Sequence, residues 1–148
     1  MRIAPSLLRT AVLAALALVP ALAHAQQREA LGQSSATLTP AIRVGNMVYA
    51  SGQLPALRGP DADTTIQGQT RSTLNNVKRV LESAGTTIDN AGKCTVFLVE
   101  GSDFRGMTEA YATFWPVAPP ARTTVIVKGL VVPGAKLEIE CNAVMPAK

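Results

Sequence analysis

The chain of 148 residues contains a single histidine and only two cysteines, and this scarcity excludes several mechanisms. The histidine, His24, lies in a segment that we expect to be cleaved off, so no imidazole remains as the base of a Ser-His-Asp or Cys-His arrangement. Two cysteines and scattered carboxylates have poor spacing for a zinc site. No glycine-rich loop for nucleotide phosphates is present. The chemistry therefore rests on arginine, glutamate, hydroxyl and backbone groups, without a cofactor or metal.

The first 25 residues have the pattern of a secretory signal peptide. Arg2 and Arg9 form a basic start, residues 11–23 form an apolar run, and Ala23-His24-Ala25 is a small-residue cleavage site. A membrane anchor is the alternative, but a spanning helix needs about 20 apolar residues and this run is shorter. We expect cleavage before Gln26, a periplasmic or secreted protein, and no membrane association after cleavage.

Removal of this segment also changes the charge of the protein. The full chain carries a net charge of +4, and losing Arg2 and Arg9 leaves 12 basic and 10 acidic residues in the remaining 123, a net charge of +2. Such a weak charge without a basic run does not support a nucleic-acid partner.

We expect a flexible leader over residues 26–38, rich in polar residues, and one domain over residues 39–148.

Apolar periodicity predicts elements in the order β-β-α-β-α-β-β. Strands are expected at 42–44 and 47–51, joined by Gly45-Asn46, and at 93–100, 121–127 and 136–144. The first helix is expected from Ile66 to Ala84 with Gly85 as its cap. The second helix has Ser102 as its expected N-cap and ends before Pro116. These segments supply five strands, whereas the α+β sheet that we expect is mixed and six-stranded, with both helices on one face.

Two apolar sets complete this expected architecture. Val48, Phe97 and Val125 would be exposed on the sheet face opposite the helices, and oligomerisation is the simplest cover for them. In the second helix one stripe is assigned to the hydrophobic core, and its members are Phe104, Met107, Tyr111 and Phe114.

Cys94 and Cys141 each alternate with apolar residues, so both are predicted to point inward from strands. Export to an oxidising compartment would permit a disulfide between them. Buried thiols are common, however, and a bridge between neighbouring strands is geometrically demanding. We expect two free thiols.

Arg122 and Glu138 are the candidate functional side chains. Arg122 follows two prolines at the start of a strand, and its guanidinium can bind a carboxylate through two charge-assisted hydrogen bonds. An ion pair with Glu138 or Glu140, which share one strand face, is the simpler interpretation. A partly buried glutamate could instead orient a water molecule. Ser51 and Gly52, at the end of the hairpin, could approach a ligand closely.

The segment from Val44 to Pro55 resembles the first signature of the RidA/YjgF family. Further family motifs follow in the same order and spacing, at Gln69–Arg71, Asn75–Val77, Cys94–Leu98, Pro119–Val125 and Leu137–Glu140. The resemblance covers about Thr39 to Val144. It implies a chorismate-mutase-like fold and a homotrimer with ligand clefts between subunits.

The resemblance also implies an activity, the hydrolysis of reactive 2-imino or 2-enamino acids to 2-oxo acids and ammonia without a cofactor. By position, Arg122 would hold the carboxylate of the substrate and Glu138 would orient water at the imine carbon. Gly52 would contribute backbone contacts, with Ser51 nearby.

Three positions depart from the family pattern. Leu38 stands in place of a tyrosine that closes the site, Thr108 replaces an asparagine, and Thr124 replaces a cysteine or serine. Thr108 and Thr124 are therefore expected to line the substrate site with hydroxyls. The alternative to an imine deaminase is a trimeric, non-catalytic binding module for small carboxylates or partner proteins. A ribonuclease ranks last, since neither a histidine nor a basic groove supports it.

Overall fold

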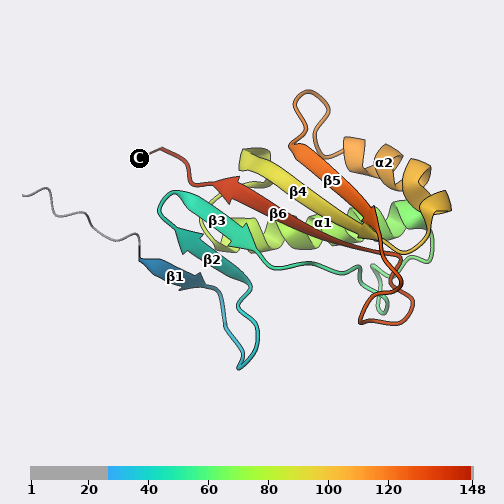
Figure 1. Ribbon diagram of the computed structural model, residues 1–148, viewed down its shortest axis with the longest axis horizontal. Coiled ribbons are helices and arrows are strands. Elements are labelled where there is room, and N and C mark those ends of the chain that lie inside the picture. Colours follow the sequence, from blue (N-terminus) through green and yellow to red (C-terminus); the bar gives the residue numbers. More distant parts are fainter. Residues whose placement is uncertain (1–26, 148) are drawn as a thin grey trace, which may run out of the picture.

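A computed structural model describes residues 27–147 of the protein, so the expected signal peptide lies outside the described residues. Six strands form one mixed sheet in the order β1-β2-β3-β6-β4-β5 (Figure 1). The strands are β1 (Arg28–Leu31), β2 (Ala41–Val44), β3 (Met47–Ala50), β4 (Ala91–Leu98), β5 (Ala121–Ile126) and β6 (Leu137–Val144). Only the β4–β5 pair is parallel, and the other pairs are antiparallel.

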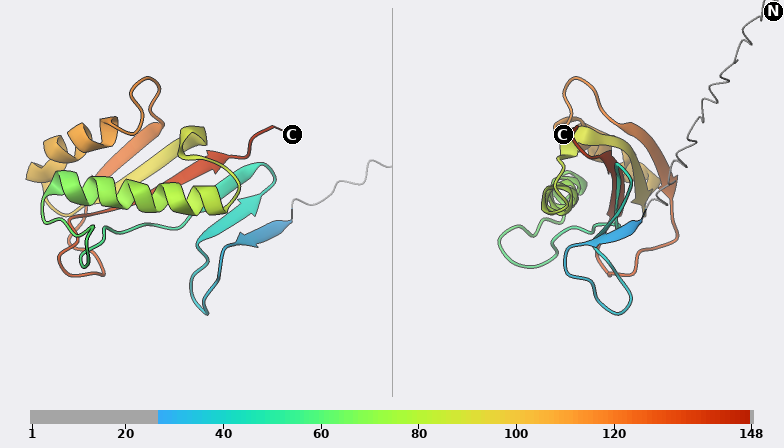
Figure 2. Two further views of the ribbon diagram at one scale, coloured as in Figure 1. Left: turned by 180° about the vertical axis from the view of Figure 1, so that it is seen from behind. Right: turned by 90° about the vertical axis from the view of Figure 1, so that its left-hand side faces the viewer.

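Both helices, α1 (Ile66–Ser83) and α2 (Phe104–Ala112), lie on one face of the sheet (Figure 2). Helix α1 begins after Thr65, whose hydroxyl accepts a hydrogen bond from the Gly68 backbone N–H at 3.1 Å. It ends before Gly85, which has a φ of 84° and so relies on the conformational freedom of glycine. The expected α+β fold is confirmed. Within residues 27–147, neither helix is long and apolar enough to cross a membrane.

Alternation along the strands separates a helix-facing side from an open side. Leu137, Ile139 and the other odd-numbered residues of β6 are buried against the helices, together with Val96 and Leu98 of β4. The open side retains apolar surface, since Tyr49 and Val125 are 46% and 38% exposed. Among the described residues, the segment 127–131 lies against this face beside Phe97 and Glu138, but Tyr49 and Val125 stay exposed.

Val48 was predicted to lie on the open face, and this prediction is wrong. The register of β3 places Val48 opposite Ala143 of β6, and both residues are buried on the helix-facing side. The next residue, Tyr49, points to the open side instead. A short apolar run does not reveal which of its residues faces the core, because that depends on its pairing with a distant strand.

The segment expected to be a flexible leader contains β1, which is missing from the order that we predicted. Arg28 pairs with Val44 and Leu31 pairs with Ala41, in an antiparallel ladder with β2. Without this partner β2 would be the edge of the sheet, with unpaired backbone groups. The polar composition of residues 26–38 is typical of a flexible segment and does not indicate that part of it pairs with β2. The sequence pattern alone therefore did not predict β1.

The start of the second helix also differs from the prediction. Ser102 lies inside a short 3-10 helix, Gly101–Asp103, and α2 begins only at Phe104. Asp103 precedes α2 and its side chain makes no capping hydrogen bond. The 3-10 turn thus replaces the predicted serine cap at this terminus.

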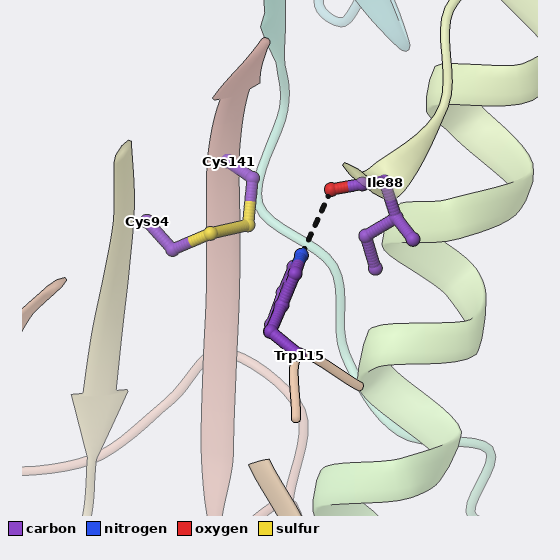
Figure 3. The surroundings of a disulfide bond; sticks show 4 residues. All are labelled: Ile88, Cys94, Trp115 and Cys141. Carbon is purple, nitrogen blue, oxygen red and sulfur yellow. Dashed lines mark hydrogen bonds between the residues drawn. A yellow bond between two sulfur atoms is a disulfide. The ribbon is translucent and has the colours of Figure 1, made fainter. Parts of the chain in front are cut away.

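Cys94 and Cys141 form a disulfide in the core of the protein, so the prediction of two free thiols is wrong (Figure 3). The two cysteines are directly opposite each other in the antiparallel β4–β6 pair, with 4.1 Å between their Cα atoms. Both are fully buried on the helix-facing side. Opposite residues of such a pair come close enough to be bridged, but only the register shows that they are opposite. Nearby, the indole N–H of Trp115 donates a hydrogen bond to the carbonyl of Ile88 at 3.0 Å.

We expect loss of this disulfide to lower the free energy of unfolding by about 2–4 kcal/mol, because the bridge restrains the unfolded chain. It joins residues 47 positions apart in the sequence. Urea unfolding with and without a reductant, followed by the fluorescence of Trp115, the only tryptophan, measures the change. The Cys94→Ala/Cys141→Ala double variant is the control, since a reductant should leave its midpoint unchanged. Coincident curves for the unmodified protein would show that the thiols are free.

Candidate functional site

The two candidate charged side chains lie on opposite faces of the sheet. Arg122, in β5, is the pairing partner of Cys94 in β4 and points to the helix-facing side. Glu138, in β6, pairs with Phe97 of β4 and points to the open side. Phe97 is three positions after Cys94, which corresponds to about 10 Å along a strand and a change of face. A single chain therefore does not bring Arg122 and Glu138 together.

The guanidinium of Arg122 rests against helix α2. Its central carbon lies 4.9 Å from the ring centroid of Tyr111 and 5.7 Å from that of Phe104. Nη2 donates to the Thr108 hydroxyl at 3.3 Å, and Nη1 lies 3.9 Å from the sulfur of Met107. These four residues form one stripe of the helix, at positions i, i+3, i+4 and i+7. All of the contacts of Arg122 with this stripe are to uncharged groups.

No carboxylate of residues 27–147 forms a salt bridge with Arg122. The simpler interpretation from sequence, an ion pair with Glu138 or Glu140, is therefore wrong. The physical reason is the strand alternation, which directs these glutamates to the open face. The charge of Arg122 remains available to an anionic ligand.

Three buried hydroxyls have no hydrogen-bond partner among the described residues: that of Thr73 in α1, and those of Tyr111 and Thr124 on the side of the sheet that carries Arg122. Burial raises the pKa of Tyr111 to about 12, and the nearby charge of Arg122 only partly opposes this effect. The phenol is therefore neutral at physiological pH. Thr124 is two residues from Arg122 in β5 and so faces the same side. The predicted site residues Arg122, Thr108 and Thr124 thus gather beside α2.

Glu138 lies against Gly52 on the other side of the sheet. A side chain at Gly52 would overlap the Glu138 carboxylate, because the Cβ position is only 2.9 Å from Cδ of Glu138 and still closer to Oε1. The adjacent backbone groups hold this approach in place, since Gln53 and Ile139 exchange two hydrogen bonds of 2.9 and 3.0 Å. Glycine is thus required here to admit the carboxylate, rather than for a turn.

Burial, and secondarily the charge of Glu140, raises the pKa of Glu138. The carboxylate lines a cavity of about 300 Å³ whose other lining residues carry no charge. Those residues are Phe97, Val127, Gly129, Leu130 and Val131. An environment of this kind suits a carboxylate that accepts and returns a proton.

Ser51 is close to this site in sequence, but its hydroxyl is engaged elsewhere. It donates a hydrogen bond to the carbonyl of Thr39 at 2.7 Å, and the Ser51 backbone N–H donates to Pro40. Leu38, next to this contact, is exposed. The structure therefore places Ser51 as a support of the loop that carries Leu38.

Sequence reasoning missed the role of the α2 stripe. Phe104, Met107 and Tyr111 were assigned to the core. Met107 and Tyr111 are buried, but the assignment is wrong for Phe104, which is 45% exposed. All three side chains also contact Arg122. Thr108, which was predicted to line the site, lies between these residues on the same helix face. Its position could have indicated that this face of α2 meets Arg122. Among residues 27–147, no group of three or more His, Cys, Asp or Glu side chains is placed to hold a metal ion.

Comparison with known proteins gives a consistent family assignment. The profile of the family described as Endoribonuclease L-PSP matches residues 27–145, which includes β1. The protein mmf2 of Schizosaccharomyces pombe is 38% identical over 105 residues, which cover 70% of this chain and 83% of mmf2. The chloroplastic Reactive Intermediate Deaminase A of Arabidopsis thaliana is 34% identical over 107 residues, 71% of this chain and 57% of the plant protein. The chain thus spans less than two thirds of that relative, and 65% of the related mmf1.

Solved structures agree with this assignment. TdcF of E. coli, crystallised with bound serine, superposes with a TM-score of 0.68 at 32% identity, covering 79% of this chain and 94% of TdcF. The YjgF gene product of E. coli has a TM-score of 0.70 at 29% identity, covering 78% of this chain and 98% of YjgF. From the profile match, the shared fold and the sequence identity to these relatives, the chain belongs to the Endoribonuclease L-PSP family, which is the RidA/YjgF family.

Proposed function

We propose that the protein hydrolyses reactive 2-imino or 2-enamino acids to 2-oxo acids and ammonia. The observation that carries the proposal is that Arg122 and Glu138 both lack an ion-pair partner within residues 27–147. An arginine free of a counter-charge can bind a carboxylate, and a glutamate with a raised pKa can act as a base. The name of the plant relative, Reactive Intermediate Deaminase A, supports the same chemistry.

In the proposed reaction Arg122 binds the substrate carboxylate through two N–H groups. Glu138 accepts a proton from a water molecule while the water oxygen adds to the carbon of the protonated imine, which gives a neutral tetrahedral carbinolamine. Glu138 then returns this proton to the nitrogen. The carbon–nitrogen bond breaks while Glu138 takes the hydroxyl proton, so the carbonyl forms, and the released ammonia accepts that proton and leaves as ammonium, which restores the ionised Glu138. One water is consumed for each ammonia released, and no cofactor is needed.

The proposed site requires more than one copy of the chain. Because Arg122 and Glu138 lie on opposite faces of one sheet, a substrate can reach both only where two subunits meet. A homotrimer of the type that the family resemblance implies would cover the open face around Tyr49 and Val125. In this proposal Arg122 of one subunit acts with Glu138 of a neighbouring copy.

We place the reaction in the cell envelope, as a periplasmic or secreted activity, on the basis of the predicted signal peptide. Imines would then be supplied by an oxidation of amines or amino acids in the same compartment. The uncharged lining of the cavity beside Glu138 is suited to a substrate with a small, uncharged side chain.

The second candidate function is a binding module for small carboxylates. The observation that favours it is the bound serine in the TdcF structure, since serine carries the carboxylate that Arg122 would bind. A ribonuclease, which the family description also names, ranks below both candidates because the only histidine, His24, lies in the predicted signal peptide.

Ammonia release from freshly generated 2-imino acids tests the proposed function. We expect Arg122→Ala to lower kcat/KM about 100-fold, because two hydrogen bonds to a charged group are lost. The kcat/KM of Arg122→Lys should lie between that of the unmodified protein and that of Arg122→Ala, because lysine keeps the positive charge but lacks the planar pair of N–H donors. Arg105→Ala is the matched control, because Arg105 is exposed and pairs only with Glu109. Equal rates for the unmodified protein and Arg122→Ala would remove the enzyme proposal, and carboxylate binding without turnover would favour the binding module.

The pH dependence of kcat/KM tests the role of Glu138. The rate should rise with pH through the pKa of Glu138, because only the ionised carboxylate accepts a proton, and burial places this rise above the usual glutamate range. Glu140→Gln should shift the rise to lower pH by removing the like charge, whereas the exposed Glu109→Gln should not. A shift to higher pH in Glu140→Gln would contradict the assignment.

Gly52→Ala tests the close approach of Gly52 to Glu138. The added methyl would displace the end of a flexible side chain, so the free energy of unfolding should change by no more than about 1 kcal/mol. The rate should nevertheless fall about 100-fold, because the base is moved from its position. Gly92→Ala is the control, since a Cβ there meets no atom within 4 Å. A fully active Gly52→Ala protein would exclude Glu138 in this position as the base.

A further inference from the structure

Arg122 is held by aromatic rings in a place where a carboxylate would be the usual partner. Partly buried arginines are normally paired, because an isolated charge is poorly solvated away from water. Here the neighbours of the guanidinium are two rings, a hydroxyl and a thioether, all from α2. Helix α2 thus packs against the guanidinium of Arg122 without neutralising its positive charge.

The acidic residues at α2 are engaged by other cations. Asp103, just before the helix, accepts a hydrogen bond from Lys136 at 3.1 Å, and Glu109 pairs with Arg105 at 3.0 Å. Glu109 is one residue from the stripe that faces Arg122, but it points toward the exposed Arg105 side chain. These two ion pairs keep the nearest acidic side chains of α2 away from the guanidinium.

An aromatic ring stabilises a guanidinium in a different way from a carboxylate. The negative face of the ring attracts the cation electrostatically, but the ring carries no net charge. Contact through the face of the guanidinium leaves the N–H groups at its edge free for a carboxylate. The only acceptors that the guanidinium meets within the described residues are the Thr108 hydroxyl, in a long hydrogen bond of 3.3 Å, and the Met107 sulfur at 3.9 Å, which is a weak acceptor.

We propose that Tyr111, assisted by Phe104, is a positioning residue that holds Arg122 as a carboxylate receptor, and that it acts through its ring and not through its hydroxyl. We call the two residues the aromatic cradle. The proposal deepens the proposed function, on which it rests for the identity of the substrate. It concerns carboxylate binding, which can be measured without turnover.

The packing around Tyr111 explains why the ring has a fixed place. It is only 3% exposed, and its centroid lies 4.9 Å from that of Trp115. Trp115 is in turn held by its hydrogen bond to Ile88. The Tyr111 hydroxyl makes no hydrogen bond in the described part of the chain, so removing it breaks no hydrogen bond there. Phe104 is 45% exposed and more distant from Arg122, which predicts a smaller contribution.

The experiment measures the binding of pyruvate, a stable 2-oxo acid, by calorimetry for the unmodified protein and its variants. Tyr111→Phe keeps the ring and should bind pyruvate within about twofold of the unmodified protein. Tyr111→Leu should weaken binding about 5- to 30-fold, and Phe104→Leu about 2- to 5-fold. With 2-imino acids, KM should rise in the same order while kcat stays unchanged, because the two rings contact Arg122, which binds the carboxylate, and not Glu138, which acts on the water.

A ring that only fills the core would give a different result. Tyr111→Leu would then lower the melting temperature without a specific loss of pyruvate affinity, or would lower kcat and affinity together. If Tyr111→Leu does not fold, Phe104→Leu carries the test, because its largely exposed ring contributes little to the core. Unchanged affinity in the folded leucine variants, or equal losses in Tyr111→Phe and Tyr111→Leu, would overturn the proposal.

The outcome also separates this proposal from the proposed function. If Arg122→Ala abolishes pyruvate binding and the cradle variants weaken it, the cradle stands even where no ammonia is released from imines. If the unmodified protein releases ammonia but Arg122→Ala binds pyruvate equally well, the protein is a deaminase in which another group binds the carboxylate. The proposal for the aromatic cradle is then wrong. Absence of pyruvate binding to the unmodified protein would also overturn the cradle.

Discussion

The antiparallel pairing of β4 with β6 is the constraint on which the rest of the structure depends. Its register places Cys94 opposite Cys141 on the helix-facing side and Phe97 opposite Glu138 on the open side. A slip of one residue would exchange the two faces and expose the core. The disulfide joins the two strands at the centre of this pairing (Figure 3). Through β4, the same register also positions Arg122 in β5.

Each face of the sheet carries one half of the candidate site, and each half leaves its charged group without a partner. Arg122 contacts neutral groups of α2, and Glu138 lies between a glycine and an apolar cavity. Unpaired charges are unfavourable in a folded chain, so they indicate function more strongly than a paired arginine and glutamate would. The opposite directions of the two groups explain why one subunit alone is an incomplete catalyst in the proposed mechanism.

Much of the fold could be predicted from local patterns. The hairpin around Gly45 and the helix ending at Gly85 follow from turn and cap chemistry, which neighbouring residues determine. The errors share a different cause. The burial of Val48 and the Cys94–Cys141 bridge depend on pairing with β6, which is far away in the sequence, and β1 depends on its pairing with the next strand, β2. No local pattern carries that information.

By itself, the sequence determined the residue types available for chemistry, the order of the elements and the family motifs that surround Arg122 and Glu138. Only the tertiary structure decided where these side chains point. It separated the two charged groups and directed Arg122 to the rings of Tyr111 and Phe104. It also brought Gly52 against Glu138. The physical reason is that the spacing of residues defines the faces of a strand or helix, whereas the register and packing of distant elements decide what each face meets.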